Sequence, residues 1–218
     1  MATPYFQIRR QSVASTQDVA LEELDDLPVL VLATEQSLGR GRSGAEWMNA
    51  SRALAASLAI RLHEADQRPF SLMAGLAALK VAVGSCLKWP NDVMIRDRKV
   101  GGILVERSGE VVVIGLGMNL WWPKPPEAMG GIYSDDPGEE TYAELGGLWG
   151  AELMNLIETD GWPIDEYRER CATLGRQITW TPFGQGEAVD IGEDGALIVE
   201  TAAGKESLRS GVVREVRG

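Results

Sequence analysis

Three apolar runs between residues 93 and 120 constrain the fold of this chain most. Residues 93–95, 100–105 and 111–120 are rich in β-branched side chains, and only short charged turns separate them. Runs of this kind, joined by turns of a few residues, pair as neighbouring antiparallel strands. The chain therefore has to build a sheet around an antiparallel meander, with residues 96–98 and 107–110 as its turns.

Other segments surround this meander with helices and one further strand. Residues 29–34 form an apolar, β-branched run that predicts a buried strand, and residues 15–18 have the pattern of a capped helix start. Residues 121–138 are rich in Pro, Gly, Asp and Trp without periodicity, which predicts a long loop of the kind that is often functional. Helical spacing of apolar residues predicts helices over residues 53–62, 72–83 and 141–157, and a shorter helix ending near residue 174.

The pattern changes at Gly175, which offers a helix C-cap. The strand candidates beyond it, separated by Gly-rich turns, are residues 177–181, 187–191, 196–200, 206–209 and 212–216. Five short strands so close together favour a small β-barrel of the SH3-like kind. We therefore expect a domain boundary near Gly175.

Composition narrows the classes of function. A formal net charge of −11 disfavours nucleic-acid binding, which depends on clustered Lys and Arg. No apolar run approaches the ~20 residues of a membrane helix, and the first ten residues hold no apolar signal core. Cys86 and Cys171 fit neither a disulfide framework nor a metal spacing, so we expect a cytoplasmic protein without membrane or nucleic-acid partners. The single histidine, His63, is interpreted as a solvated residue at the end of a helix.

A glycine-rich segment follows the strand at residues 29–34. Residues 39–44 read Gly-Arg-Gly-Arg-Ser-Gly and match the G-x-G-x-x-G pattern, yet residues 46–49 do not continue as a helix. A dinucleotide loop leaves its pyrophosphate to backbone N–H groups at a helix start. We interpret this segment instead as a loop that presents Arg40 and Arg42 to an anion, with a solvated surface turn as the alternative.

A second unusual stretch is Lys-Trp-Pro-Asn-Asp at residues 88–92, followed by Lys99 and the pair Gly101-Gly102. A turn needs only the Pro, Asn and Asp, so the turn does not explain why Trp89 and Lys99 are present. Glycines weaken a strand, and a pair of them suggests that a ligand or another backbone comes very close. A bulge or a simple bend is the alternative.

Taken in order, these motifs resemble the biotin protein ligases, or biotin–[acetyl-CoA-carboxylase] ligases, of the wider biotin/lipoate protein ligase family. The motifs are Ser15-Thr16-Gln17, Gln36 with residues 39–42, residues 88–92, Lys99 with Gly101-Gly102, and residues 115–119. The resemblance runs from about Ser15 to the C-terminus. It implies an α+β fold: a mixed, largely antiparallel sheet with helices over residues 1–174, and an SH3-like β-barrel over residues 175–218.

The resemblance implies a reaction in two steps that uses ATP and Mg²⁺. The carboxylate of biotin attacks the α-phosphate of ATP to give biotinyl-5′-AMP and pyrophosphate, and a lysine of a biotin carboxyl carrier protein domain then takes the biotinyl group. Two anions that react repel each other, so nearby cations would stabilise the developing charge, and a carboxylate needs no general base. The carrier domain of a biotin-dependent carboxylase is the implied partner, and pairing through sheet edges is common among relatives.

The resemblance also assigns site residues. The expected catalytic residues are Lys99, Arg40 and Arg42. The expected biotin-binding residues are Ser15, Thr16, Gln17, Gln36, Gly39, Arg40, Gly41, Arg42, Lys99, Gly101 and Gly102. The expected ATP-binding residues are Arg42, Asn91, Lys99 and Asn119, the expected metal ligand is Asp92, and either Arg209 or Arg214 could reach the nucleotide.

Two positions depart from the family pattern. Ala45 stands where many relatives carry Arg, which removes one phosphate contact worth ~1.5–3 kcal/mol, and Gln17 replaces Asn but keeps an amide. We expect a monofunctional ligase, because no winged-helix DNA-binding domain precedes Ser15. The alternatives are a lipoate-type ligase, against which residues 88–92 and the Gly pair argue, and a non-catalytic protein that binds biotin or biotinyl-adenylate, which Ala45 suggests.

Overall fold

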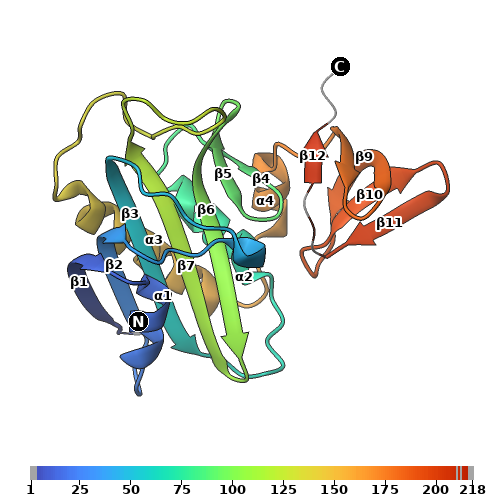
Figure 1. Cartoon of the computed structure of the whole chain (residues 1–218). Helices are drawn as coiled ribbons and strands as arrows, with labels where there is room; N and C mark the ends of the chain where they lie inside the picture. Colours follow the sequence, from blue (N-terminus) through green and yellow to red (C-terminus); the bar gives the residue numbers. More distant parts are fainter. Residues whose placement is uncertain (1–3, 210, 212, 216–218) are drawn as a thin grey trace.

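The computed structural model of the chain describes residues 4–209, 211 and 213–215. They form an α+β fold with a seven-stranded mixed sheet in the order β1-β2-β3-β7-β6-β5-β4 and a five-stranded antiparallel sheet beside it (Figure 1). The strands of the larger sheet are β1 (Phe6–Val13), β2 (Val29–Gln36), β3 (Arg52–Arg61), β4 (Cys86–Lys88), β5 (Asp92–Ile95), β6 (Arg98–Ser108) and β7 (Val111–Trp121). The helices are α1 (Thr16–Glu22), α2 (Phe70–Leu79), α3 (Thr141–Glu158) and α4 (Ile164–Arg170), with a short 3₁₀ turn, η1, at Arg42–Gly44.

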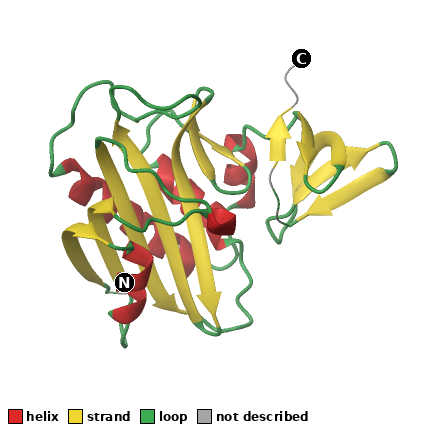
Figure 2. Ribbon diagram, in the orientation of Figure 1, coloured by secondary structure: helices red, strands yellow, loops and turns green. Residues whose placement is uncertain are grey.

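The two faces of the larger sheet have different covers. Helices α2 and α3 lie against one face, where Leu30, Leu54 and Leu58 belong to the main core (Figure 2). On the other face α1 packs through Ala20 onto the outer part of the sheet, near Val31. The rest of that second face, over β3, β7 and β6, is where the loop after β2 crosses the sheet (Figure 1).

The prediction of a helix over residues 53–62 is wrong, because this segment is the central strand β3. Strand β3 pairs with β2 on one side and β7 on the other, and nearly every residue in it is buried. A strand buried on both faces loses the alternation that marks strands in a sequence, and its alanines suit a helix equally well. His63 follows this strand in an exposed turn, which confirms that it is solvated but not that it ends a helix.

Most other predicted elements of the larger sheet are confirmed. Strands β5, β6 and β7 form the antiparallel meander, and its first turn is tighter than expected because Arg98 already belongs to β6. The helices predicted over residues 72–83 and 141–157 are α2 and α3, and residues 122–140 carry no helix or strand. The sequence analysis did not predict β1, a largely exposed edge strand that pairs parallel to β2.

The smaller sheet contains the five strands expected beyond Gly175, in the order β11-β10-β9-β8-β12. They are β8 (Gln177–Trp180), β9 (Gly184–Ile191), β10 (Leu197–Thr201), β11 (Gly204–Leu208) and β12 (Val213–Glu215). Residues 212 and 216, the ends of the last predicted strand, lie outside the described residues. Closure of this sheet into a barrel and a domain boundary at residue 174 stay predictions.

Trp89 connects the turn at residues 88–92 to the smaller sheet. Its side chain is 2% exposed, and its indole N–H donates to the carbonyl of Gly195 at 2.9 Å. Its backbone N–H donates to the buried hydroxyl of Thr173 at 3.0 Å. The tryptophan that the turn itself does not need is therefore a structural link between the two sheets.

Replacing Trp89 with Phe is expected to lower the free energy of unfolding by ~1–3 kcal/mol, because the carbonyl of Gly195 loses its donor in a buried place. The midpoint of urea unfolding, followed by far-UV circular dichroism, measures this loss. The matched control is Trp162→Phe, whose indole donates to the Glu193 carbonyl at an exposed position and should cost less than half as much. Equal losses in the two variants would contradict a linking role for Trp89.

Candidate functional site

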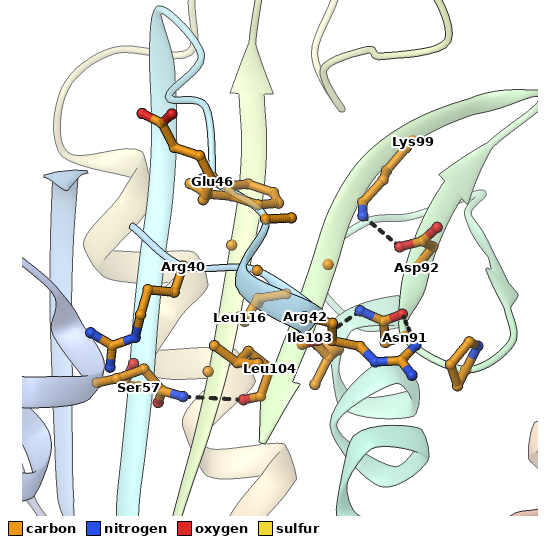
Figure 3. Close-up of a pocket in the computed structure, with 18 of the residues that line it drawn as sticks. Arg40, Arg42, Glu46, Ser57, Asn91, Asp92, Lys99, Ile103, Leu104 and Leu116 are labelled. Atoms are coloured by element: carbon orange, nitrogen blue, oxygen red, sulfur yellow. Dashed lines mark hydrogen bonds and ion pairs between the residues drawn. The ribbon is translucent and has the colours of Figure 1, made fainter. Parts of the chain in front are cut away.

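A cavity of about 570 Å³ opens on the face of the larger sheet opposite α2 and α3. That volume is in the range of pockets that hold small molecules. Its lining comes from α1, the loop after β2, strands β3, β6 and β7, and the turn before β5 (Figure 3). Residues of the smaller sheet complete the lining. The predicted site residues that line it are Ser15, Thr16, Gln17, Gln36, Arg40, Gly41, Arg42, Asn91, Asp92, Lys99 and Gly102.

Glycines form part of the floor of the cavity. Gly102 of β6 lies opposite Gly117 of β7, so backbone is exposed to the cavity over both strands. A Cβ on Gly117 would come within 2.6 Å of the Trp47 ring, and one on Gly102 within 3.2 Å of Lys99 Nζ. The Trp47 ring therefore packs onto the sheet at a place that only glycine leaves open.

Only one residue of the Gly101-Gly102 pair faces the cavity. Successive residues of a strand point to opposite faces, so Gly101 points to the side of Val93 and Met118. A Cβ there would lie 3.0 Å from the carbonyl oxygen of Gly117. The expectation of a close approach is therefore met twice, by Trp47 and Lys99 above Gly102 and by backbone beside Gly101.

The start of α1 forms a buried polar end of the cavity. Thr16 donates from its backbone N–H and its hydroxyl to Gln36 Oε1 at 2.8 and 3.0 Å, and its hydroxyl lies 2.8 Å from the Ser57 hydroxyl. Ser15 is the N-cap residue of α1, although its hydroxyl makes no capping hydrogen bond. These groups hold the first turn of α1 in place under the cavity.

Gln17 carries an unsatisfied acceptor at this end. Its amide nitrogen donates to the Leu104 carbonyl at 3.4 Å, while Oε1 has no hydrogen-bond partner among the described residues. The residue is only 6% exposed. Buried polar atoms without partners are costly, so Oε1 is an acceptor placed for a ligand that donates a hydrogen bond.

Cations gather at the other end. Lys99 Nζ lies 2.5 Å from Asp92 Oδ1, and Arg42 donates to Asn91 Oδ1 at 3.1 Å (Figure 3). Asn91 is fixed in turn, because its amide donates to the carbonyl of Ile103 at 2.9 Å. This end can bind an anion through Lys99 and Arg42 while Asp92 offers a carboxylate.

Arg40 points away from this cationic end (Figure 3). Its guanidinium donates to both carboxylate oxygens of Asp18 at 2.7 and 2.8 Å and to Glu106 at 3.2 Å. Arg40 lowers the pKa of Asp18 below its usual value, and Asp18 raises the pKa of Arg40. A carboxyl with a lowered pKa stabilises the fold above its usual pKa, and that contribution is lost only as the pH falls through the lowered value, so the pair stays charged near neutrality.

Three predicted residues do not line the cavity. Gly39 lies in the loop after β2, where a Cβ would lie 3.1 Å from both Gln36 and Trp47, and Gly101 faces the opposite side of the sheet. Asn119 is fully buried in β7, and neither polar atom of its side chain has a partner among the described residues.

Neither of the two arginines expected to reach the nucleotide, Arg209 and Arg214, lines the cavity. Arg209 forms an ion pair with Asp194 at 2.7 Å, and Arg214 is exposed. The smaller sheet reaches the cavity through other residues: Thr181, Gly211 and Val213.

The sequence analysis missed several lining residues, including Trp47, Ser57 and Glu46. Trp47 and Glu46 follow the two arginines in the same loop, so the loop itself was the available signal. Ser57 was hidden because residues 53–62 were taken for a helix. A fully buried serine in an apolar strand is unusual enough to mark a site once the strand is known.

Two classes of feature are absent from the described part of the chain. No helix there is long and apolar enough to cross a membrane. Within the same residues, no group of three or more His, Cys, Asp and Glu side chains gathers as a metal site built from protein ligands alone would require. Asp92 is therefore a single carboxylate beside the cations and not part of an all-protein metal cage.

Comparison with known proteins decides the family. The model of the biotin/lipoate A/B protein ligase family matches residues 8–119, which is more than half of the chain. The biotin–[acetyl-CoA-carboxylase] ligase of Paracoccus denitrificans is 33% identical over an alignment of 207 positions, which covers 82% of this chain and 86% of that protein. The chain belongs to the biotin/lipoate A/B protein ligase family.

Another curated relative and a solved structure also match this chain over most of its length. The biotin–[acetyl-CoA-carboxylase] ligase of Mycobacterium tuberculosis is 30% identical over an alignment of 219 positions, which covers 87% of this chain and 79% of the relative. Among solved structures, the biotin protein ligase from Aquifex aeolicus in complex with biotin and ATP matches with a TM-score of 0.78 at 23% identity, over 98% of this chain and 99% of that one. The family resemblance noticed in the sequence is confirmed, and so is an α+β fold with a large mixed sheet and a second antiparallel sheet.

Proposed function

We propose that this chain is an ATP-dependent biotin protein ligase, which converts biotin to biotinyl-5′-AMP and transfers biotin to a lysine of a biotin carboxyl carrier protein domain. The observation that carries the proposal is one cavity with an unpartnered buried acceptor, Gln17 Oε1, at one end and the cations Lys99 and Arg42 at the other. The ureido ring of biotin has N–H donors for that acceptor. Its carboxylate lies at the far end of an apolar tail, which suits the cationic end.

The first step joins two anions. An oxygen of the biotin carboxylate bonds to the α-phosphorus of ATP while the bond from that phosphorus to the bridging oxygen breaks, and pyrophosphate leaves. Lys99 and Arg42 hold the carboxylate and the phosphate together and offset their repulsion. No side chain has to remove a proton, which agrees with a cavity that His63 does not line.

In the second step the neutral amine of the carrier lysine attacks the acyl carbon of biotinyl-5′-AMP. The bond from that carbon to the AMP oxygen breaks, and AMP leaves as the amide forms and the amine loses a proton. Lys99 is placed to stay with the phosphate of AMP through both steps. We take it as the central catalytic residue.

Arg42, and not Arg40, is the loop cation that we assign to the phosphate. Arg42 donates to Asn91, which lies next to Asp92, whereas Arg40 is held by Asp18 and Glu106. Gly39, Gly101 and Asn119 do not line the cavity, so the proposal gives them no direct contact with substrate.

Asp92 fits a role in binding Mg²⁺. Magnesium in nucleotide sites is usually held by one or two carboxylates and by the phosphates of the substrate, and Asp92 is a lining carboxylate beside the cations. When bound, the ion would offset phosphate charge. Asp92 pairs with Lys99 at 2.5 Å, so this carboxylate has to exchange one cation for another when substrates enter.

The partners follow from the reaction and the surface. The carrier domain is the macromolecular substrate, and the net charge of −11 argues against nucleic acid and a repressor role. We place the enzyme in the cytoplasm. The smaller sheet, as an SH3-like barrel, would close the nucleotide end through Thr181, Gly211 and Val213. Edge strand β1 suits pairing with a second copy of the chain.

One assay tests the proposal. The purified protein is supplied with ATP, Mg²⁺, a carrier domain and either biotin or lipoate, and the mass of the carrier is followed. We expect a biotinyl adduct and no lipoyl adduct. A lipoyl adduct alone would replace the proposal with a lipoate-type ligase, and biotin binding without any adduct would leave a binding protein.

A further inference from the structure

The loop between β2 and β3 closes on itself above the cavity. Its two arms are joined by hydrogen bonds from Trp47 N–H to the Gly39 carbonyl at 2.9 Å and from Gly41 N–H to the Ala45 carbonyl at 2.6 Å. We call residues 39–47 the cover loop. Its own hydrogen bonds give it shape, but they do not hold it against the sheet.

Arg40 attaches the cover loop to the body of the protein at the end where α1 begins. Its guanidinium binds Asp18 of α1 through two hydrogen bonds at 2.7 and 2.8 Å and Glu106 of β6 through one at 3.2 Å. Arg42 makes the second attachment, through Asn91, at the cationic end. Arg40 and Arg42 therefore hold the cover loop at opposite ends of the cavity. Only Arg42 lies at the cationic end, where we place the adenylation step.

The Arg40 attachment lies beside the polar end of the cavity. Asp18 directly follows Gln17, whose Oε1 is the unpartnered acceptor. Glu106 lies two residues beyond Leu104, whose carbonyl accepts from the Gln17 amide. Any opening of the loop at Arg40 would therefore uncover the part of the cavity that we assign to the biotin ring.

Exposed ion pairs usually contribute little, ~0–1 kcal/mol, and these side chains are 39–48% exposed. This set differs from an ordinary surface pair in two respects. Arg40 uses its fork on both oxygens of Asp18, and the three charges come from three elements distant in sequence. These ion pairs therefore connect a loop to the sheet and to α1, whereas an ordinary surface ion pair joins two elements that are already ordered.

We propose that Asp18 and Glu106 act through Arg40 as positioning residues that hold the cover loop closed over bound biotin. The proposal rests on the proposed function. We call the ion pairs of Arg40 with Asp18 and Glu106 the clamp. The clamp sets how long biotin stays bound, whereas Lys99 and Arg42 act in the adenylation step. Loss of the clamp should therefore weaken biotin binding without slowing the reaction of the biotin that is bound.

The first test uses the free protein and no substrate. Amide hydrogen exchange of Gly41 and Trp47, whose N–H groups bond within the cover loop, is compared between the wild-type protein and Asp18→Asn. We expect exchange in the cover loop to become ~10-fold faster, because a ~1.4 kcal/mol loss is tenfold in an opening equilibrium. The matched control is Asp136→Asn, which breaks a similarly exposed ion pair with Arg52 outside the cavity and should leave the cover loop unchanged.

The second test uses biotin. For Asp18→Asn we expect KM for biotin and the dissociation rate of biotin to rise ~10-fold with kcat within twofold, and for Glu106→Gln a rise of about threefold, since its contact is single and longer. Asp18→Glu should recover part of the loss. Added salt should raise the wild-type KM but not that of the Asp18→Asn, Glu106→Gln double variant.

The outcomes separate the two proposals. Unchanged exchange in the cover loop of Asp18→Asn, or a fall in kcat at unchanged KM, would overturn the clamp. Faster exchange in the variant, together with no biotin binding by the wild-type protein, would uphold Arg40 as the attachment of the cover loop but overturn the proposed function and the role of the ion pairs in holding biotin. Faster exchange with a raised KM and an unchanged kcat supports both.

Discussion

Lys99→Ala is expected to lower the rate of biotinyl-5′-AMP formation at least ~10²–10³-fold, because it removes a preorganised cation from the point where two anions react. The same change should leave the fold intact. Lys99 lies on β6 with its side chain 29% exposed, and its polar contact is with Asp92, which is 26% exposed and can be solvated by water when the partner is lost. Activity and stability are therefore expected to separate in this variant.

Pyrophosphate release in the presence of biotin and ATP measures the adenylation step directly. The matched control is Lys80→Ala, which removes a lysine at the end of α2 that pairs with Glu152 outside the cavity. That variant should keep wild-type activity. Circular dichroism and thermal unfolding check the fold of both variants, and normal adenylation by a folded Lys99→Ala protein would show that our assignment of Lys99 is wrong.

Gly117→Ala is expected to weaken biotin binding by about two orders of magnitude, since ~2.7 kcal/mol is a factor of 100. The added Cβ would lie 2.6 Å from the Trp47 ring, closer than carbon atoms can approach, so the ring and the cover loop have to move off the sheet. The backbone of β7 itself accepts alanine, because Gly117 is an ordinary strand residue paired with Ala55 and Gly102. Isothermal titration with biotin measures the loss.

A double-mutant cycle identifies the cause of that loss. If the methyl group of Gly117→Ala acts by displacing the Trp47 ring, it should cost little in a Trp47→Ala background, and the two changes should be strongly non-additive. Additive losses would mean that the methyl group blocks biotin itself. That result would contradict the explanation by Trp47 packing. The loss of binding would then come from direct contact between the added methyl group and biotin.

Local patterns in the sequence were sufficient to predict much of the fold. The meander of β5, β6 and β7, helices α2 and α3, and the five strands of the smaller sheet all follow from apolar runs, periodicity and turn residues. The failures are at the centre and the edge of the larger sheet. Strand β3 is apolar on both faces and rich in alanine, and β1 is polar and held by its pairing with β2, so neither has the alternation that predicts a strand.

Most of the predicted site residues line one cavity, although strands β1 and β3 of the sheet around them were not predicted. Residues such as Lys99, Arg42 and the Asn91-Asp92 pair are uncommon in combination, and their order along the chain was enough to indicate a family and a reaction. Trp47 and Ser57 were missed because the loop and the strand that hold them do not show by themselves which side chains face the cavity. Each becomes a lining residue only through a neighbour distant in the sequence, Gly117 for Trp47 and Thr16 for Ser57.

The sequence by itself determined the reaction class, because the chemistry depends on residue types in a fixed order. Only the tertiary structure decided which neighbours each of these residues has and which of them line the cavity. The alternation of strand β6 turns Gly102 toward the cavity and Gly101 away from it, which no count of glycines could predict. Carboxylates on α1 and β6 draw Arg40 away from Lys99, so two arginines that look equivalent in the sequence have different partners. Such assignments depend on contacts between distant segments, and those contacts exist only once the sheet has formed.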